Sequence, residues 1–205
     1  MKIRLVYFSG TGSTRHVAET FRNELESRNS TVETVSAGKL KQPSGSQYDL
    51  LIICHPVHAF NPPKPVIEWV ENQEDADLTP AAVISVSGGG EITPNLACRV
   101  LLKKKLAEKN FRVVYEKMIV MPSSCVIPTG KALADRLIYI LPYKVSYCAD
   151  EILSGKKIIL HPGTGSRILS VIGRMEHRFA QYIEKRMKIK NTCQAMRLMR
   201  TTVPC

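Results

Sequence analysis

The sequence lacks the features of several protein classes. No uninterrupted apolar run approaches the roughly 18 residues of a membrane-crossing helix, so a membrane-spanning bundle is excluded. The six cysteines are irregularly spaced, which argues against a disulfide framework, and no His, Cys, Asp or Glu cluster has the spacing of metal ligands. The hydrophobic fraction of 44% and the charged fraction of 23% are ordinary for a folded domain rather than a disordered chain.

A secretory signal is also missing. The apolar run in MKIRLVYFSG is short, and no small-residue cleavage site follows it, so we expect a cytoplasmic protein. The length of 205 residues suits one domain. We expect that domain to span residues 1–188, with residues 131–188 as a helical extension and residues 189–205 as a disordered tail.

Acidic residues are scarce. The chain has 18 Asp and Glu against 29 Lys and Arg, a net charge of +11. The segment from Thr164 to the C-terminus has nine basic and two acidic residues, so it holds +7 of that charge. Because the excess is concentrated there, the charge does not imply nucleic-acid binding by the body of the protein.

Short apolar runs alternate with amphipathic stretches along the first 121 residues. The predicted strands are Ile3–Phe8, Thr31–Ser36, Tyr48–Cys54, Ala81–Ser87 and Phe111–Met121. The predicted helices between them are Thr14–Arg28, Pro65–Asn72 and Glu91–Lys109, the last with Leu96, Val100, Leu101 and Leu106 facing inward. This alternation predicts an α/β fold with a parallel sheet and helices on both faces.

The remainder is predicted to be helical. Lys131–Leu153 has a helical pattern that Pro142 should break or kink. Ser166–Lys188 has an apolar stripe along one side and basic residues elsewhere, which predicts an amphipathic helix packed on the sheet. An alternative is that this basic helix docks on an acidic protein or an anionic membrane surface, although we expect no membrane contact.

The most informative segment is Ser9-Gly10-Thr11-Gly12-Ser13-Thr14, between the first strand and the first helix. Its two glycines allow a tight turn that exposes successive N–H groups, and its four hydroxyls add donors. The start of the helix adds a partial positive charge. Together these groups predict a phosphate-binding loop. It is neither a Walker loop nor a dinucleotide fingerprint, because it lacks the Gly-Lys-Ser/Thr ending and the third glycine. A plain helix-capping turn is the structural alternative.

The segment VYFSGTGSTRHVAETF resembles the FMN phosphate loop of flavodoxins, whose pattern is Thr/Ser-x-Thr-Gly-x-Thr. Ser9, Thr11, Gly12, Ser13 and Thr14 fill that pattern. The sequence of this segment is especially similar to the flavodoxin half of flavodoxin–ferredoxin fusion proteins. The resemblance implies a flavodoxin-like, doubly wound, five-stranded parallel sheet of order 2-1-3-4-5 with extra C-terminal helices, and FMN as the cofactor. The cysteine runs of the fusion proteins' ferredoxin half are absent.

In a sheet of this order, ligands bind at the carboxyl ends of the strands near the switch point. The resemblance therefore places the flavin ring between the loops that follow the third and fourth strands. Our predicted ring contacts are Pro56, Val57, His58, Ala59, Phe60, Ser87, Gly88, Gly89 and Gly90. His58 and Phe60 offer flat faces for stacking, and the glycines allow a close approach of backbone N–H groups. Phe60 could instead pack on the sheet, and the glycines could form a plain turn.

Two functions fit these residues. The first is a flavodoxin-like electron-transfer protein that shuttles electrons between redox partners. It is favoured because no acid, base or nucleophile except His58 lies in the predicted ring site. The alternative is an FMN-dependent NAD(P)H oxidoreductase that acts on a quinone or another small acceptor. Well-known flavodoxins are acidic, whereas this chain is basic. We therefore expect a hydroquinone/semiquinone potential less negative than that of an acidic flavodoxin. We also expect redox partners with an acidic surface, such as ferredoxin-like proteins.

Overall fold

The computed structural model describes residues 1–38, 47–123, 128–161, 163 and 165. In chain order the elements are β1 (Lys2–Tyr7), α1 (Ser13–Glu26), β2 (Thr31–Ser36), β3 (Leu50–Pro56), α2 (Lys64–Glu71), β4 (Pro80–Ser87), the 3₁₀ helix η1 (Asn95–Arg99), α3 (Val100–Glu108), β5 (Arg112–Val120), α4 (Lys131–Tyr139) and α5 (Leu141–Leu153).

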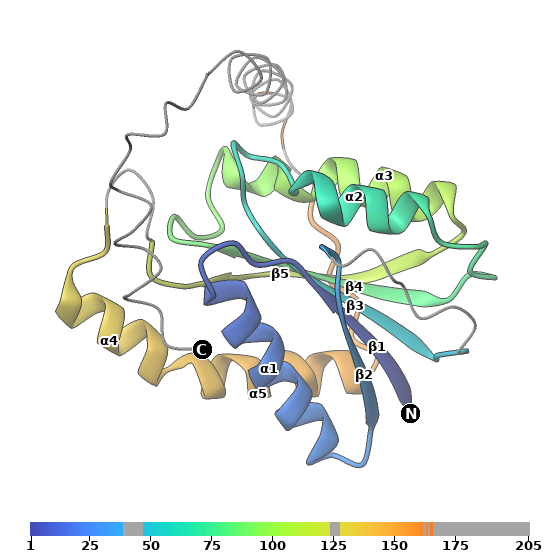
Figure 1. Ribbon diagram of the computed structural model, residues 1–205, viewed down its shortest axis with the longest axis horizontal. Helices are drawn as coiled ribbons and strands as arrows, with labels where there is room; N and C mark the ends of the chain where they lie inside the picture. The colour runs from blue at the N-terminus through green and yellow to red at the C-terminus, as the bar shows by residue number, and fades with distance from the viewer. Residues whose placement is uncertain (39–46, 124–127, 162, 164, 166–205) are drawn as a thin grey trace, which may run out of the picture.

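The five strands form one parallel sheet of order β2-β1-β3-β4-β5. Helices α1 and α5 cover one face of this sheet, and α2 and α3 cover the other (Figure 1). The order reverses between β1 and β3, so the loops that leave the carboxyl ends of these two strands diverge to opposite faces. The predicted fold class is confirmed.

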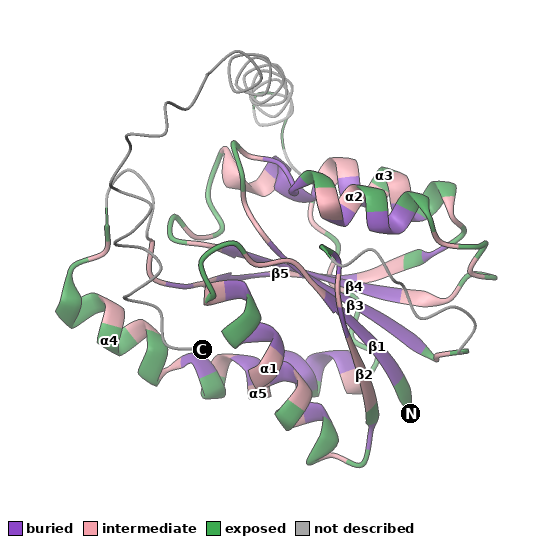
Figure 2. Cartoon of the chain, in the orientation of Figure 1, coloured by how far each residue is buried: buried purple, intermediate pink, exposed green. Residues whose placement is uncertain are grey.

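Each face of the sheet has its own apolar core. Val17, Phe21 and Leu25, spaced for one face of a helix, pack with α5 on the first face. Trp69 of α2 and Leu106 of α3 pack on the opposite face. The central strand β3 is buried on both faces, as its continuous apolar run requires (Figure 2).

The predicted bounds of two elements next to the site were wrong. The strand predicted at residues 48–54 runs from Leu50 to Pro56, because its last two residues pair with Ser85 and Val86 of β4. The helix predicted from Glu91 begins as η1 at Asn95, after Pro94, whose ring and missing N–H oppose a helix interior.

This later start changes the buried face of that helix. Leu102 and Leu106 of α3 are fully buried, and Arg99 of η1 is fully buried as well. Leu96, Val100 and Leu101, which we predicted to face inward together with Leu106, are only half-buried. Only Leu106 of the four predicted positions is therefore confirmed.

The predicted break at Pro142 is confirmed, since α4 ends at Tyr139 and α5 begins at Leu141. Arg28, which follows α1, binds Asp150 of α5 at 2.8 Å and holds the two helices together. Beyond α5, Ile158 forms a parallel bridge with Tyr115 at the outer edge of β5. The predicted helix Ser166–Lys188 and the predicted tail 189–205 lie outside the described residues. Within the described ranges, no helix has both the length and the apolar character needed to cross a membrane.

Candidate functional site

The predicted phosphate loop joins β1 to α1 at the carboxyl edge of the sheet. Gly12 has φ 98° and ψ −26°, a left-handed conformation that favours glycine over residues with a Cβ. Its N–H donates to the Ser9 hydroxyl at 3.1 Å, and its carbonyl accepts the first helical bond, from His16, at 2.9 Å. The glycine therefore turns the chain directly from β1 into the helix.

The beginning of α1 lacks the groups that usually stabilise a helix N-terminus. No side chain caps it, and the first turn contains no acidic residue. The exposed Arg15 stands in that turn instead, and its guanidinium donates to Glu19 of the next turn at 2.8 Å. Since the first N–H groups of a helix have no acceptor within it, this end has free donors and a positive potential.

The loop's hydroxyls differ in exposure. Thr11 is exposed, Ser9 and Ser13 are half-buried, and Thr14 is buried at 2% exposure on the inner face of α1. A side chain built on Gly10 or on Gly12 would meet no atom within 4 Å, so open space borders the loop. The loop can therefore accept an anion through its backbone and Thr11, while a direct contact from Thr14 remains a prediction.

The loop after β3 is a tight turn. His58 and Asn61 exchange two backbone hydrogen bonds, both 2.9 Å, and Ala59 and Phe60 between them have φ values of 44° and 59°. Non-glycine residues in this region carry a conformational cost, which is common where a loop is held for function. The Asn61 amide donates to the Ala59 carbonyl at 2.8 Å and helps to hold the turn.

The structure adds Phe8 to the predicted residues of this edge. Its ring meets His58 edge to face, with ring centroids 6.4 Å apart and an interplanar angle of 81°. Phe8 follows β1 directly and was predicted only as a strand residue, because its neighbour is 50 positions away in the sequence. His58 and Ala59 are exposed, whereas Phe60 is half-buried.

The loop after β4 is held by the protein's own packing. The Asn95 amide donates to the Ser87 hydroxyl at 3.3 Å and to the Gly90 carbonyl at 3.1 Å. A Cβ on Gly88 would lie 2.8 Å from Cβ of Ser123, and one on Gly89 would lie 2.7 Å from the Asn95 amide nitrogen. Packing against Ser123 and Asn95 therefore favours glycine at both positions, whether or not a ligand also approaches them.

Backbone hydrogen bonds hold the loops side by side. The N–H of Val57 donates to the Val86 carbonyl at 3.1 Å, and the N–H of Met121 donates to the Ser87 carbonyl at 3.2 Å. Phe8 likewise donates to Cys54 at 3.2 Å. The predicted segments 9–14, 56–60 and 87–90 therefore meet at one edge of the sheet, as the strand order requires.

A buried charged cluster, which the sequence analysis missed, lies beneath the loop after β4. Arg99 is fully buried, and its Nη1 binds Glu91 at 3.0 Å, directly after the glycines. Its Nε lies 3.5 Å from Glu116 of β5, which is also buried and binds Lys103 at 2.7 Å. No local pattern marks these residues, because a charged side chain in sequence normally indicates a solvent-exposed face.

The titratable groups nearby are not arranged for acid–base chemistry. Burial lowers the pKa of His55 to about 4, and its Nδ1 lies 2.9 Å from the Pro56 carbonyl, so the residue has a structural role. Cys54 and Cys98 are buried, and burial raises the pKa of both thiols, that of Cys98 to about 11. Cys125 lies outside the described residues.

Comparisons with known proteins agree with this arrangement. Residues 4–120 match the model of the family described as "Flavodoxin domain". No curated protein matches the chain significantly.

Among solved structures, oxidised Flavodoxin 2 from Bacillus cereus has a TM-score of 0.53 and 16% identity, and the match covers 75% of this chain and 99% of that one. A flavodoxin mutant from Fusobacterium nucleatum, bound to flavin mononucleotide, has a TM-score of 0.50 and 14% identity, with coverage of 75% and 95%. A Pseudomonas aeruginosa flavodoxin mutant has the same score and identity, with coverage of 71% and 99%. At these identities the likeness establishes the fold.

Proposed function

Because the chain belongs to the flavodoxin domain family, we propose that it binds FMN and transfers electrons between redox partner proteins. The observation that carries this proposal is the beginning of α1. That end has unused backbone donors and no capping side chain or acidic residue in its first turn, and a bound anion would supply the missing acceptor and negative charge.

The phosphate of FMN fits this loop by charge and by shape. Backbone N–H groups and the exposed Thr11 hydroxyl would hold the phosphate oxygens, and Ser9 and Ser13 stand close by. No lysine or arginine lies within the loop, so neutral donors and the helix dipole supply most of the attraction. The open space beside Gly10 and Gly12 leaves room for the phosphate.

The ring would lie across the other two loops. His58, with Phe8 against its edge, is an exposed flat group on one side, and the backbone of Ser87–Gly90 supplies N–H groups on the other. The Fusobacterium nucleatum flavodoxin, which shares this fold, holds flavin mononucleotide. Bound flavin supplies the redox chemistry, while this chain orients the ring and limits its contact with water.

An electron carrier is favoured over a reductase by the titratable groups at this edge. His58 is the one exposed imidazole in the turn after β3, and the buried His55 is uncharged at neutral pH. The side-chain bonds that fix the loop after β4 are internal to the protein, from the Asn95 amide to Ser87 and Gly90. Neither loop presents an acid and a base paired for work on an organic substrate.

The charge of the chain and its resemblance to fusion proteins indicate the kind of redox partner. The net charge of +11 favours acidic redox proteins, and the resemblance to the flavodoxin half of flavodoxin–ferredoxin fusions points to a ferredoxin-like protein.

Purified protein loaded with FMN tests this function. We expect rapid electron exchange with an acidic ferredoxin and no steady-state oxidation of NADH or NADPH with a quinone. Turnover of either nucleotide at rates typical of enzymes, above about 1 per second, would instead establish the oxidoreductase alternative. Failure to bind FMN at all would reject both functions.

A further inference from the structure

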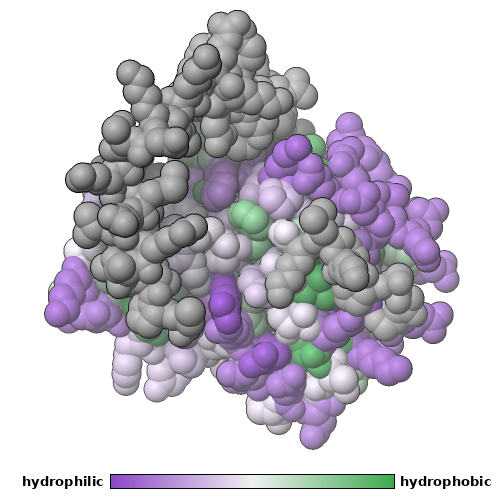
Figure 3. Space-filling model, viewed as in Figure 1, coloured by the Kyte–Doolittle hydropathy of each residue, from purple (hydrophilic) through white to green (hydrophobic). Residues whose placement is uncertain are grey.

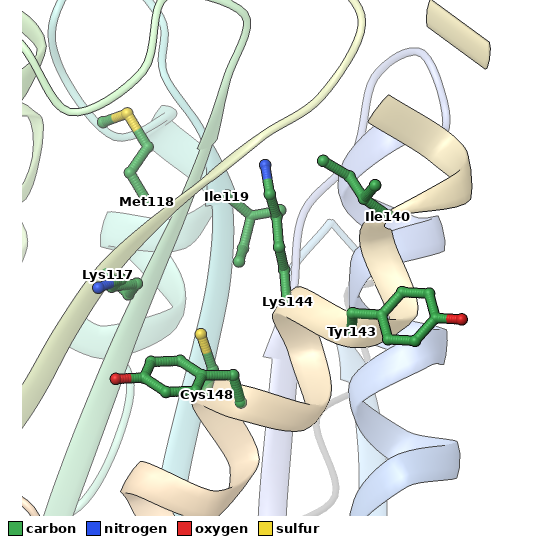
Figure 4. A pocket seen from close by; sticks show the side chains of 8 residues that line it. Lys117, Met118, Ile119, Ile140, Tyr143, Lys144 and Cys148 are labelled. Atoms are coloured by element: carbon green, nitrogen blue, oxygen red, sulfur yellow. The ribbon is translucent and has the colours of Figure 1, made fainter. Parts of the chain in front are cut away.

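An apolar groove lies on the far side of β5 from the sheet's centre. It has a volume of about 410 Å³ and runs between the outer part of β5 and helix α5. Ile119 from β5 and Ile140, which lies between α4 and α5, line it, and Lys117 and Lys144 stand at its sides (Figure 4). A groove of this size, mostly apolar with a few charged groups, has the character of a recognition site.

The surface beside the groove is unusually aromatic for exposed helices. Tyr139, Tyr143 and Tyr147 follow one another at intervals of four residues, and they are 72%, 68% and 57% exposed. The rings of Tyr139 and Tyr143 are 6.3 Å apart. Tyrosine combines a large apolar area with a polar tip and is enriched at protein interfaces, so this tyrosine row indicates a docking surface.

Helix α4 extends the same apolar surface. It contains no buried residue among its nine positions, although Leu133 and Ile138 are apolar and are 56% and 47% exposed. Figure 2 shows α4 as exposed or half-exposed along its length. The outer surface over α2 and α3 is, by contrast, predominantly hydrophilic (Figure 3). The uncovered apolar surface is thus concentrated on the α4–α5 side.

The charge of the groove selects the kind of partner. Neither Lys117 nor Lys144 has an ion pair within the described part of the chain. The two acidic residues of α5 are already engaged, Asp150 with Arg28 and Glu151 with Lys156. A partner that covers the groove must therefore supply negative charge.

This chain's own C-terminal segment does not meet that requirement. The segment from Thr164 onward has a net charge of +7, so it would bring positive charge to the two lysines. The connector also leaves on the opposite face of the sheet. The Leu160 carbonyl accepts from Lys103 of α3 at 2.9 Å, and its N–H donates to Glu116 at 3.1 Å.

The groove and the proposed flavin site are linked along β5. Ile119 precedes Met121 by two residues, or about 7 Å along the strand, and Met121 donates to Ser87 of the loop after β4. We propose that the groove and the tyrosine row form a docking surface for an acidic protein, the redox partner of the proposed function, on which this inference rests. Its carboxylates meet Lys117 and Lys144, and apolar side chains fill the groove.

Calorimetric titration of the full-length chain with an acidic two-cluster [4Fe–4S] ferredoxin at low salt tests the surface. Replacing Lys117→Glu and Lys144→Glu together should raise Kd about tenfold or more, and so should Tyr143→Ala. The matched control is Lys64→Glu with Lys104→Glu, which makes the same charge change on the α2–α3 side, where both side chains are exposed. The control should change Kd less than about threefold.

Each contrary outcome overturns the proposal. If ferredoxin does not bind, an acidic protein of this kind is excluded as the partner. If both double variants weaken ferredoxin binding equally, the effect comes from net charge and not from the groove. Acetylation of the free protein supplies a second measurement, in which the half-buried Lys144 should react, although more slowly than the exposed Lys104. Protection of Lys144 in the free monomer would show that this chain covers the groove, and protection only in a dimer would assign it to a second copy.

Titrations with and without FMN separate this inference from the proposed function. Binding of ferredoxin by flavin-free protein, weakened about tenfold or more by the groove variants, supports the docking surface even if FMN fails to bind. Normal FMN binding with groove variants that bind ferredoxin as tightly as the parent protein rejects the docking surface alone.

Discussion

The contact between Gly88 and Ser123 allows a sharp test of how the loop after β4 is held. In Gly88→Ala the new methyl would lie 2.8 Å from Cβ of Ser123, about 1 Å closer than two carbon atoms normally pack. Neither loop can move freely, because Met121 donates to Ser87 at 3.2 Å and the Ser123 N–H donates to the Thr129 hydroxyl at 2.8 Å. Overpacking of this kind costs about 2 kcal/mol.

That cost corresponds to a fall in Tm of about 4–8 °C for a chain of this length. Because the displaced loop carries the proposed flavin contacts at residues 87–90, the affinity for FMN should fall as well. Ser123→Gly removes the clashing Cβ and keeps the backbone bond to Thr129, so it should restore most of the stability of Gly88→Ala. The double-mutant cycle should therefore give a favourable coupling of about 1–2 kcal/mol.

Urea denaturation measures the four free energies of unfolding, and FMN titration follows in parallel. Gly10→Ala is the control, because its Cβ would meet no atom within 4 Å and its φ is not positive. It should change the stability by less than about 1 kcal/mol. Strictly additive effects of Gly88→Ala and Ser123→Gly would refute the packing account of this loop.

Three further substitutions test the rest of the site. Glu116→Gln should cost about 3 kcal/mol in urea denaturation, because it leaves the buried Arg99 with Glu91 alone. Glu68→Gln, in the exposed pair with Lys64, should cost less than about 1 kcal/mol, and equal costs would contradict this. Burial lowers the pKa of His55 from 6.5 to about 4, so the unfolded chain binds this proton first, and stability should fall as the pH drops from 6.5 to 4. His55→Gln should flatten that part of the profile, and an unchanged slope would exclude His55 as its source. Gly12→Ala should cost about 1–2 kcal/mol in thermal unfolding through backbone strain alone, since its Cβ meets no atom, and an unchanged Tm would show that the turn relaxes freely.

The sequence predicted the parts of the fold that local patterns encode. The spacing of Val17, Phe21 and Leu25 marks one face of α1, and the continuous apolar run of β3 marks a strand covered on both faces. Pro142 separated α4 from α5 as expected. These signals depend only on neighbours along the chain, so one sequence suffices to detect them.

The features that the sequence missed depend on contacts between distant residues. Phe8 meets His58 across β1 and β3, and Asn95 and Ser123 fix the glycines after β4. Arg99 and Glu116 are buried beside opposite charges, Glu91 and Lys103 as well as each other, and such pairing between distant residues leaves no local trace. The phosphate loop was recognisable because its residues are contiguous, although the burial of Thr14 follows from its place on the inner face of α1.

The central claim is that the beginning of α1 binds the phosphate of FMN. Parallel fluorescence titrations with FMN and with riboflavin, which differ only in that phosphate, test it most directly. Two or more charge-assisted hydrogen bonds to the phosphate should make FMN bind about a hundredfold or more tightly than riboflavin. Equal affinities for the two flavins would contradict the claim.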